Sequence, residues 1–300
     1  MIKVFVLLLL SSIISSPATL NHSIENNSFE GHKPFRAYQG VATNGNYIYT
    51  STDQDSNFKL EPTVAWDNNN IISVYDMNGT FINEKKEIYA ARSKLGNFMS
   101  LGDITYIDGF LFGTVYDRNP PFESRVLKIS LPKLEVVNVY TIGDGLAENI
   151  TKHGGYYWVV HHNNNQVKQL DQNFKLVKTH VMSESPPVNA GYQGAFWIGD
   201  YFYANLHGAN LRNEFYAPGL DKYRYDGHNF VFIERIKPPT YGAGQGVEFY
   251  KGKVYWSDRP ENRIVITEFP MSHEKHGVKR IITSIMISIS SLFSPYMNLD

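Results

Sequence analysis

The stretch Gly191–Gly208, which reads G-Y-Q-G-A-F-W-I-G-D-Y-F-Y-A-N-L-H-G, decides the fold. Aromatic residues on both sides of Gly199-Asp200 predict two β-strands joined by a tight turn. Units of the same kind, each a strand start, a turn with glycine and an aromatic strand, recur four more times, at Tyr38–Tyr49, Gly102–Phe112, Ala147–Trp158 and Gln245–Trp256. Five copies of one hairpin predict a repeat array.

Each repeat is expected to hold four strands over about 40 to 50 residues, which is typical of one propeller blade. We therefore predict an all-β chain that folds as a five-bladed β-propeller of four-stranded antiparallel blades. The propeller domain spans residues 38–288, after a leader at 19–37 and before a C-terminal tail at 289–300. A sixth, degenerate blade stays open at this point. For the closing strand of the fifth blade we expect Arg280–Ser288, with an anchor signal, a tail removed at Lys279-Arg280 or a disordered end as alternatives.

The N-terminal residues 1–18 combine a lysine, the apolar run Val4–Leu10 and a region of small residues that ends at Ala18. This pattern is typical of a signal peptide, and it predicts secretion. The chain has no cysteine, so we expect no disulfides, and its formal net charge of −1 gives no reason to expect a nucleic-acid partner. The apolar run is shorter than the ~20 residues of a membrane span, so we expect no membrane partner, with a signal anchor as the alternative. We also expect a monomer. Four N-x-S/T triplets, the acceptors of a glycoprotein, occur at Asn21, Asn26, Asn78 and Asn149.

In propellers the first strand of each blade lines the axis, and the ends of the second strands open on the same face; this argument rests on analogy with the fold. The strand starts expected to converge there are Gln39, Asp103, Glu148, Gln193 and Gln245. The second strands add His161, His162, Asn205, His207 and Asp258, with Arg118 and Arg259 farther out. We predict a site for a small polar molecule or peptide, with Asp103, Glu148 and His207 as catalytic residues. The predicted substrate-binding residues are Gln39, Gln193, Gln245, Asn205, His161 and Asp258.

Three interpretations of this ring stay open. Asp103 and Glu148 belong to adjacent blades and would repel each other unless one binds a proton or a cation lies between them. Ca²⁺ suits carboxylate and amide oxygens, so Asp103 and Glu148 are candidate calcium ligands. Alternatively, one carboxylate with a raised pKa acts as a general acid or base. In the third interpretation, the ring only hydrogen-bonds a column of water.

The histidines and the missing motifs narrow the chemistry. Neighbours on a strand point to opposite faces, so only one of His161 and His162 is expected to face the axis. The chain has no G-x-S-x-G, phosphate-loop or H-E-x-x-H motif, which leaves serine hydrolase, P-loop and helical zinc-protease functions without support.

Three segments resemble motifs of the plant-type glutaminyl cyclases, which are secreted five-bladed propellers that close N-terminal glutamine into pyroglutamate. Tyr38-Gln39-Gly40-Val41 resembles the F-T-Q-G-L opening of that family, Gly102–Thr105 its G-E-G-L segment, and Ala204–His207 its A-N-V-W strand. The resemblance implies that Gln39 and Asp103 hold and protonate the substrate amide, with Gln193 at the place of an asparagine. Three positions depart from the family: Asp103 replaces its catalytic Glu, His207 its tryptophan, and Ala147-Glu148-Asn149 its tryptophan-bearing loop.

Two functions therefore stay open. The chain is either an acyl-transfer or cyclisation enzyme of the glutaminyl cyclase type, or a non-catalytic module that binds a sugar, peptide or protein. The second function would use the aromatic side chains Trp66, Phe215 and Tyr216 of two long loops.

Overall fold

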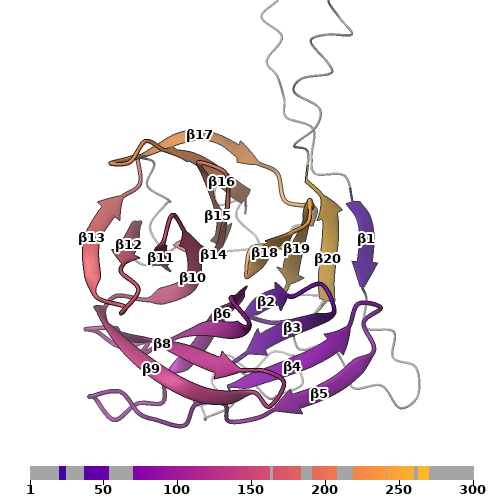
Figure 1. Cartoon of the computed structure of the whole chain (residues 1–300), viewed down its shortest axis with the longest axis horizontal. Coiled ribbons are helices and arrows are strands. Elements are labelled where there is room, and N and C mark those ends of the chain that lie inside the picture. Colours follow the sequence, from indigo (N-terminus) through magenta and orange to yellow (C-terminus); the bar gives the residue numbers. More distant parts are fainter. Residues whose placement is uncertain are drawn as a thin grey trace, which may run out of the picture.

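The computed structural model describes residues 20–24 (backbone only), 37–53, 70–162, 165–183, 191–207, 219–240, 242–259 and 263–269. These residues form five four-stranded antiparallel sheets arranged in a ring (Figure 1). The prediction of an all-β, five-bladed propeller is confirmed. Over these described ranges, no helix is long and apolar enough to cross a membrane.

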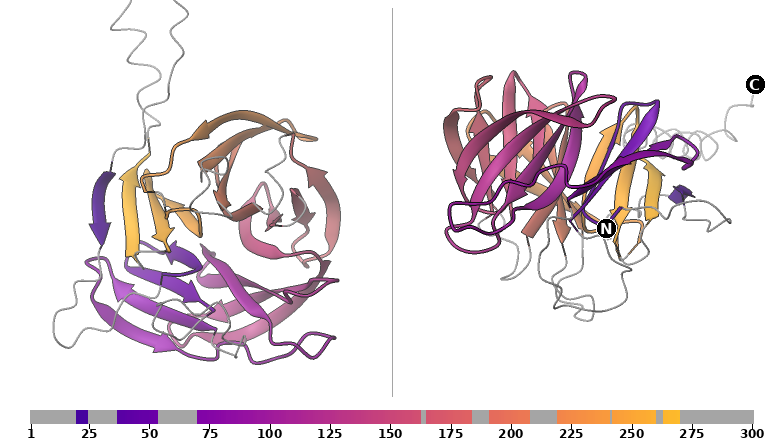
Figure 2. Two further views of the ribbon diagram at one scale, coloured as in Figure 1. Left: turned by 180° about the vertical axis from the view of Figure 1, so that it is seen from behind. Right: turned by 90° about the horizontal axis from the view of Figure 1, so that it is seen from below.

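In blades 1 to 4 the strands run outward from the axis in chain order (Figures 1 and 2). Blade 1 contains β2 (Gly40–Thr43), β3 (Tyr47–Thr52), β4 (Ile71–Asp76) and β5 (Phe81–Lys85). Blade 2 contains β6 (Ser100–Ile107), β7 (Phe110–Tyr116), β8 (Glu123–Ser130) and β9 (Glu135–Asp144). Blade 3 contains β10 (Ala147–His153), β11 (Tyr156–His161), β12 (Gln166–Leu170) and β13 (Leu176–Val181). Blade 4 contains β14 (Gly191–Ile198), β15 (Tyr201–His207), β16 (Gly219–Tyr225) and β17 (Phe230–Ile236).

Blade 5 closes the ring with strands from both ends of the described chain. It contains β18 (Val247–Tyr250), β19 (Lys253–Asp258), β20 (Arg263–Glu268) and, outermost, β1 (Leu20–Ile24). β1 pairs antiparallel with β20, so a strand from the expected leader occupies the place that the sequence assigned to Arg280–Ser288. The segment 280–288, the signal peptide and the tail lie outside the described residues. Pairing the start of the chain with the last blade leaves fewer open strand edges.

The turns within the inner hairpins explain why the repeats are readable in the sequence. Asp108 and Gly109 have φ values of 49° and 87°, and Lys251 and Gly252 have 48° and 80°. Two successive positive φ values match the right-handed twist of a hairpin and favour glycine at the second position. The predicted turns at these dipeptides are confirmed.

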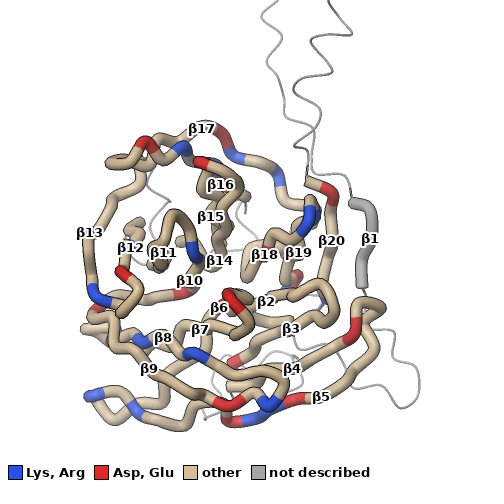
Figure 3. The backbone as a smooth tube through the Cα atoms, viewed as in Figure 1, with Lys and Arg blue, Asp and Glu red and all other residues tan. Residues whose placement is uncertain are grey.

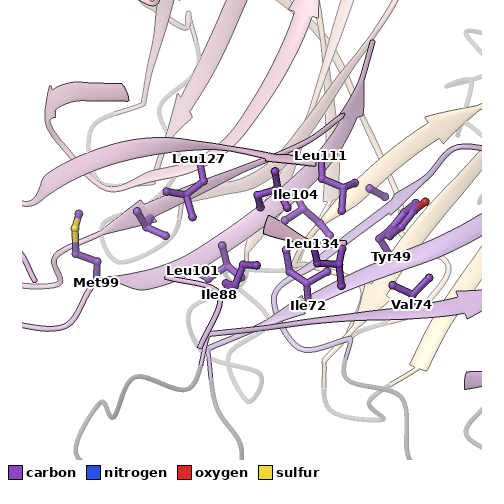
Figure 4. Packing of buried hydrophobic residues seen from close by; sticks show 13 residues of the cluster. Tyr49, Ile72, Val74, Ile88, Met99, Leu101, Ile104, Leu111, Leu127 and Leu134 are labelled. Atoms are coloured by element: carbon purple, nitrogen blue, oxygen red, sulfur yellow. The ribbon is translucent and has the colours of Figure 1, made fainter. Parts of the chain in front are cut away.

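Hydrophobic side chains fill the space between neighbouring blades. Figure 4 shows the cluster between blades 1 and 2, where Tyr49 and Ile72 face Ile104 and Leu111. Similar clusters lie at the other four blade interfaces. Charged residues of both signs lie along the outer strands and turns, for example along β17 (Figure 3). The ring is therefore held by apolar contacts between blades, each buried large side chain contributing about 1.5–3 kcal/mol.

Candidate functional site

Strand pairing aligns the five inner strands residue by residue. In every blade, the fourth residue of the second strand has one partner on the inner strand, and these partners serve as a common reference level. The pairs are Val41 with Thr50, Ile104 with Gly113, Ile150 with Val159, Ala195 with Ala204 and Val247 with Trp256. The residues two positions before these inner-strand partners are Gln39, Gly102, Glu148, Gln193 and Gln245, which we call the upper ring. One position before the same partners lie Gly40, Asp103, Asn149, Gly194 and Gly246, which we call the lower ring. The face at which the inner strands begin is called the mouth.

The alignment corrects one prediction. Asp103 belongs to the lower ring, and the residue of blade 2 that is equivalent to Gln39 and Glu148 is Gly102. The reason is a bulge in β6 between Leu101 and Ile104, which leaves two residues outside the pairing. Bulges at the same level of β10 and β14 leave Glu148 and Gln193 unpaired. Bulges redirect side chains, and here three of them act on the residues at the mouth.

Asp103 is buried on the propeller axis, and four N–H groups donate to its carboxylate. Val41 N and Ile104 N donate to Oδ1 at 3.1 and 2.8 Å, while Asn149 Nδ2 and Val247 N donate to Oδ2 at 2.9 and 3.2 Å. Burial raises the pKa of Asp103, and the backbone N–H groups oppose that rise. Asp103 thus ties blades 1, 3 and 5 to its own blade.

The glycines of the lower ring make room for this carboxylate. A Cβ atom on Gly40 or Gly246 would overlap Oδ1 of Asp103, and one on Gly194 would lie 3.0 Å from Oδ2. The Q-G dipeptides that announce three of the five repeats are therefore required by the packing around Asp103.

The surroundings of Asp103 do not fit calcium. Ca²⁺ takes six to eight oxygen ligands, whereas N–H donors occupy both oxygens of this carboxylate. Over the described ranges, no group of three or more His, Cys, Asp and Glu side chains is placed to hold a metal ion.

Glu148 lies at the mouth in a different environment. Its side chain is buried, and its Oε2 lies above Gly102, where a Cβ atom would approach it to 3.1 Å. The Tyr116 hydroxyl donates a hydrogen bond to the carboxyl group. Burial raises the pKa of Glu148 to about 8, against the opposing effects of Tyr116 and Arg118. Glu148 therefore carries a proton at neutral pH.

An ion pair that the sequence did not reveal borders Glu148. Arg118 contacts the buried carboxylate of Asp53 and donates from Nε to Ser100 Oγ at 2.8 Å. Gln39 donates a side-chain hydrogen bond to Asp53. Asp53 and Tyr116 were missed as site residues, although the signal was present: like His161 and His207, they stand at the end of a second strand.

One histidine of the pair lies at the mouth, but it is His162 and not His161, which the sequence predicted as a substrate-binding residue. His162 faces His207, with ring centroids 6.2 Å apart, and Gln245 Nε2 donates to His207 Nδ1 at 2.7 Å. Burial lowers the pKa of both rings to about 4, so both are neutral at pH 7. His161 instead packs against Gly145 in the connection between blades 2 and 3, away from His207.

Two other predicted residues support the mouth from outside it. Asn205 Nδ2 donates to the carbonyl oxygens of Ala243 (3.0 Å) and Gln245 (2.6 Å). Asp258 accepts hydrogen bonds from Arg263 Nε at 2.9 Å and from Thr240 Oγ1 at 3.0 Å. Both residues hold the connection that carries Gln245.

Several polar atoms at the mouth lack a partner within the described part of the chain. These buried atoms are Gln193 Oε1, Gln245 Oε1 and His162 Nδ1. Buried polar atoms are normally hydrogen-bonded to protein, water or ligand. The mouth therefore combines a protonated carboxyl group, an arginine–aspartate pair, neutral imidazoles and unpaired amide oxygens.

No protein-family model and no curated protein sequence matches this chain. Among solved structures, the chain is similar to the glutaminyl cyclase of Myxococcus xanthus, with 10% identity and a TM-score of 0.53 over 78% of this chain and 91% of that one. It is also similar to an exo-1,5-α-L-arabinanase from a bovine ruminal metagenomic library, with 11% identity and a TM-score of 0.53 over 82% and 97%. The shared property is the propeller fold. The resemblance to glutaminyl cyclases is therefore confirmed for the fold.

Proposed function

We propose that the mouth binds a small polar molecule or peptide end and acts on it by acid–base chemistry of the glutaminyl cyclase type. The observation that carries the proposal is Glu148, a buried carboxyl group whose pKa is raised to about 8, hydrogen-bonded by Tyr116. A carboxyl group that titrates near the working pH is suited to donate and accept protons. The unpaired oxygens of Gln193 and Gln245 are available to orient amide and amine N–H groups of a ligand.

In this reaction the α-amine nitrogen of an N-terminal glutamine attacks its own side-chain amide carbon. A new C–N bond forms, the bond to the amide nitrogen breaks, and ammonia leaves. Glu148 donates its proton to the leaving nitrogen, and its carboxylate then takes the proton that the attacking amine loses. The role that the resemblance gives to Asp103 passes to Glu148, because four N–H donors occupy the Asp103 carboxylate.

We place this activity outside the cell, because residues 1–18 have the pattern of a signal peptide. Of the glycosylation triplets, Asn78 lies exposed on the turn between β4 and β5, whereas Asn149 is buried beside Asp103. Asn78 is therefore the better acceptor of the two.

The test is the release of ammonia from a short peptide that begins with glutamine, followed by mass spectrometry. We expect turnover by the wild type and a loss of at least about 100-fold in Glu148→Gln, which keeps the shape but cannot exchange the proton. The matched control is Glu248→Gln: burial also raises the pKa of Glu248 to about 8, but this residue follows Val247 on β18, farther from the start of the inner strand than the upper ring, and it accepts a hydrogen bond from Tyr106 N.

Full activity of folded Glu148→Gln would contradict the proposal. The alternative, a binding module, depends on Trp66, Phe215 and Tyr216, which lie outside the described residues. Wild-type protein that binds the peptide without turning it over would favour that alternative.

A further inference from the structure

Arg259 lies at the mouth, directly after β19, and its surroundings are unusual for an arginine. Its guanidinium carbon lies 3.5 Å from the centre of the Tyr38 ring, and its backbone N donates to Gly242 O at 3.3 Å. The neighbouring Asp258 is engaged by Arg263. None of the described residues forms a hydrogen bond or an ion pair with the Arg259 guanidinium.

Other partly buried arginines of the described chain are paired with a carboxylate. The pairs are Arg118 with Asp53, Arg125 with Glu123 and Arg263 with Asp258, and the exposed Arg235 is likewise paired with Asp221. Burial without such a partner lowers the pKa of Arg259 to about 9. A cation taken from water without a counter-ion destabilises the folded state, which makes Arg259 a candidate for function.

Within the described part of the mouth, no free negative charge offsets that of Arg259. Asp53 neutralises Arg118, Glu148 holds its proton, and His162 and His207 are neutral at pH 7. Of the charges on these described side chains at the mouth, the positive charge of Arg259 is the one that remains.

Arg259 also contacts segments that lead to two groups of residues at the mouth: the group around Glu148 and the pair Gln245 and His207. Tyr38 precedes Gln39, which binds Asp53 beside Arg118 and Glu148. Gly242 belongs to the connection that carries Gln245, the partner of His207. A group bound at Arg259 therefore lies at the border of the proposed reaction site.

We infer that Arg259 and Tyr38 form a subsite for a carboxylate, so that the ligand of the mouth is a small carboxylate-bearing molecule. A guanidinium offers two parallel N–H donors to a carboxylate, and the Tyr38 ring covers one of its faces. The identity of the substrate rests on the proposed function: free glutamine, or a short glutaminyl peptide with a free C-terminus, fits both the subsite and the reaction.

The first experiment needs no turnover. Thermal unfolding is measured with N-acetylglycine and with its neutral amide, at an ionic strength balanced by sodium chloride. We expect the carboxylate alone to raise the Tm in a saturable way, because a ligand of the folded state stabilises it. The rise is expected to vanish in Arg259→Met and to persist in Arg92→Met, where an exposed arginine is stacked similarly, 3.8 Å from the Phe98 ring.

The second experiment separates ligand binding from a structural role. Methionine keeps an apolar chain over Tyr38 and removes the uncompensated charge, so Arg259→Met without ligand is expected to have a Tm equal to or above that of the wild type. Arg235→Met, which removes the cation paired with buried Asp221 and leaves it only the Tyr192 hydroxyl among the described side chains, is expected to lower the Tm. A fall in Arg259→Met as large as that in Arg235→Met would overturn the inference.

The two proposals fail separately. If wild-type protein does not cyclise glutaminyl peptides but N-acetylglycine stabilises it through Arg259, the carboxylate subsite stands without the proposed reaction. If the protein cyclises the peptides while N-acetylglycine, its amide and sodium chloride change the Tm equally, the subsite is refuted and the reaction stands.

Discussion

At the scale of single residues, Asp103 and Glu148 show how a shift of one position along an inner strand changes the partners of a buried carboxyl group. They are both buried carboxyl groups of inner strands, yet four N–H donors hold Asp103 while Glu148 has the Tyr116 hydroxyl as partner. The sequence placed both in one ring. A bulge of β6 moves Asp103 one layer deeper, and nothing in Gly102-Asp103 announces that bulge.

Replacement of Asp103 by Asn is expected to destabilise the fold. The amide NH₂ of Asn would face two of the four N–H donors, so we expect a loss of about 2–4 kcal/mol in the free energy of unfolding, measured with urea. Asp171→Asn is the control, because Asp171 accepts N–H groups of Asn173 and Lys175 on an exposed turn, where water compensates. Equal stability of Asp103→Asn and wild type would show that the carboxylate does not hold the blades together.

At the scale of elements, the inner hairpins were predictable and the closing strand was not. Glycine dipeptides with positive φ mark the turns, and aromatic runs mark the strands. Leu20–Ile24 carries no such signal, since its pairing with β20 depends on a partner more than 200 residues away along the chain. Asp53 and Arg118 were likewise hard to join, because their contact crosses from one blade to the next.

The close approach of inner strands gives a prediction at this scale. In Gly246→Ala the new Cβ would lie 2.5 Å from the Gly40 Cα and overlap Asp103, so we expect a loss of about 3 kcal/mol. In Gly113→Ala the nearest atoms are the ends of the Ile104 and Leu101 side chains at 3.2 Å, which can move. Urea unfolding of the two variants compares them, and equal losses would contradict the tight packing of the lower ring.

At the scale of the whole molecule, the ring brings together side chains from five blades that are far apart in the sequence. The upper ring and the ends of the second strands lie together at the mouth, with Gly102 where the sequence had placed Asp103. Which side chains face that mouth, Glu148, His162 and Arg259 among them, depends on bulges and on contacts between blades. Those contacts depend on how the whole ring packs, so they produce no local pattern in the sequence.

The central claim is that Glu148 keeps its proton at the mouth, and the pH dependence of stability tests it most directly. A pKa raised from 4.5 to about 8 stabilises the folded state at low pH, and this stabilisation is lost as the pH rises through the folded value. The measurement is the free energy of unfolding in urea from pH 6 to pH 9 for wild type and Glu148→Gln. We predict that the wild type loses stability relative to the variant by up to about 1.4 kcal/mol per pH unit until pH 8 and then levels off. Parallel curves for the two proteins would contradict the account.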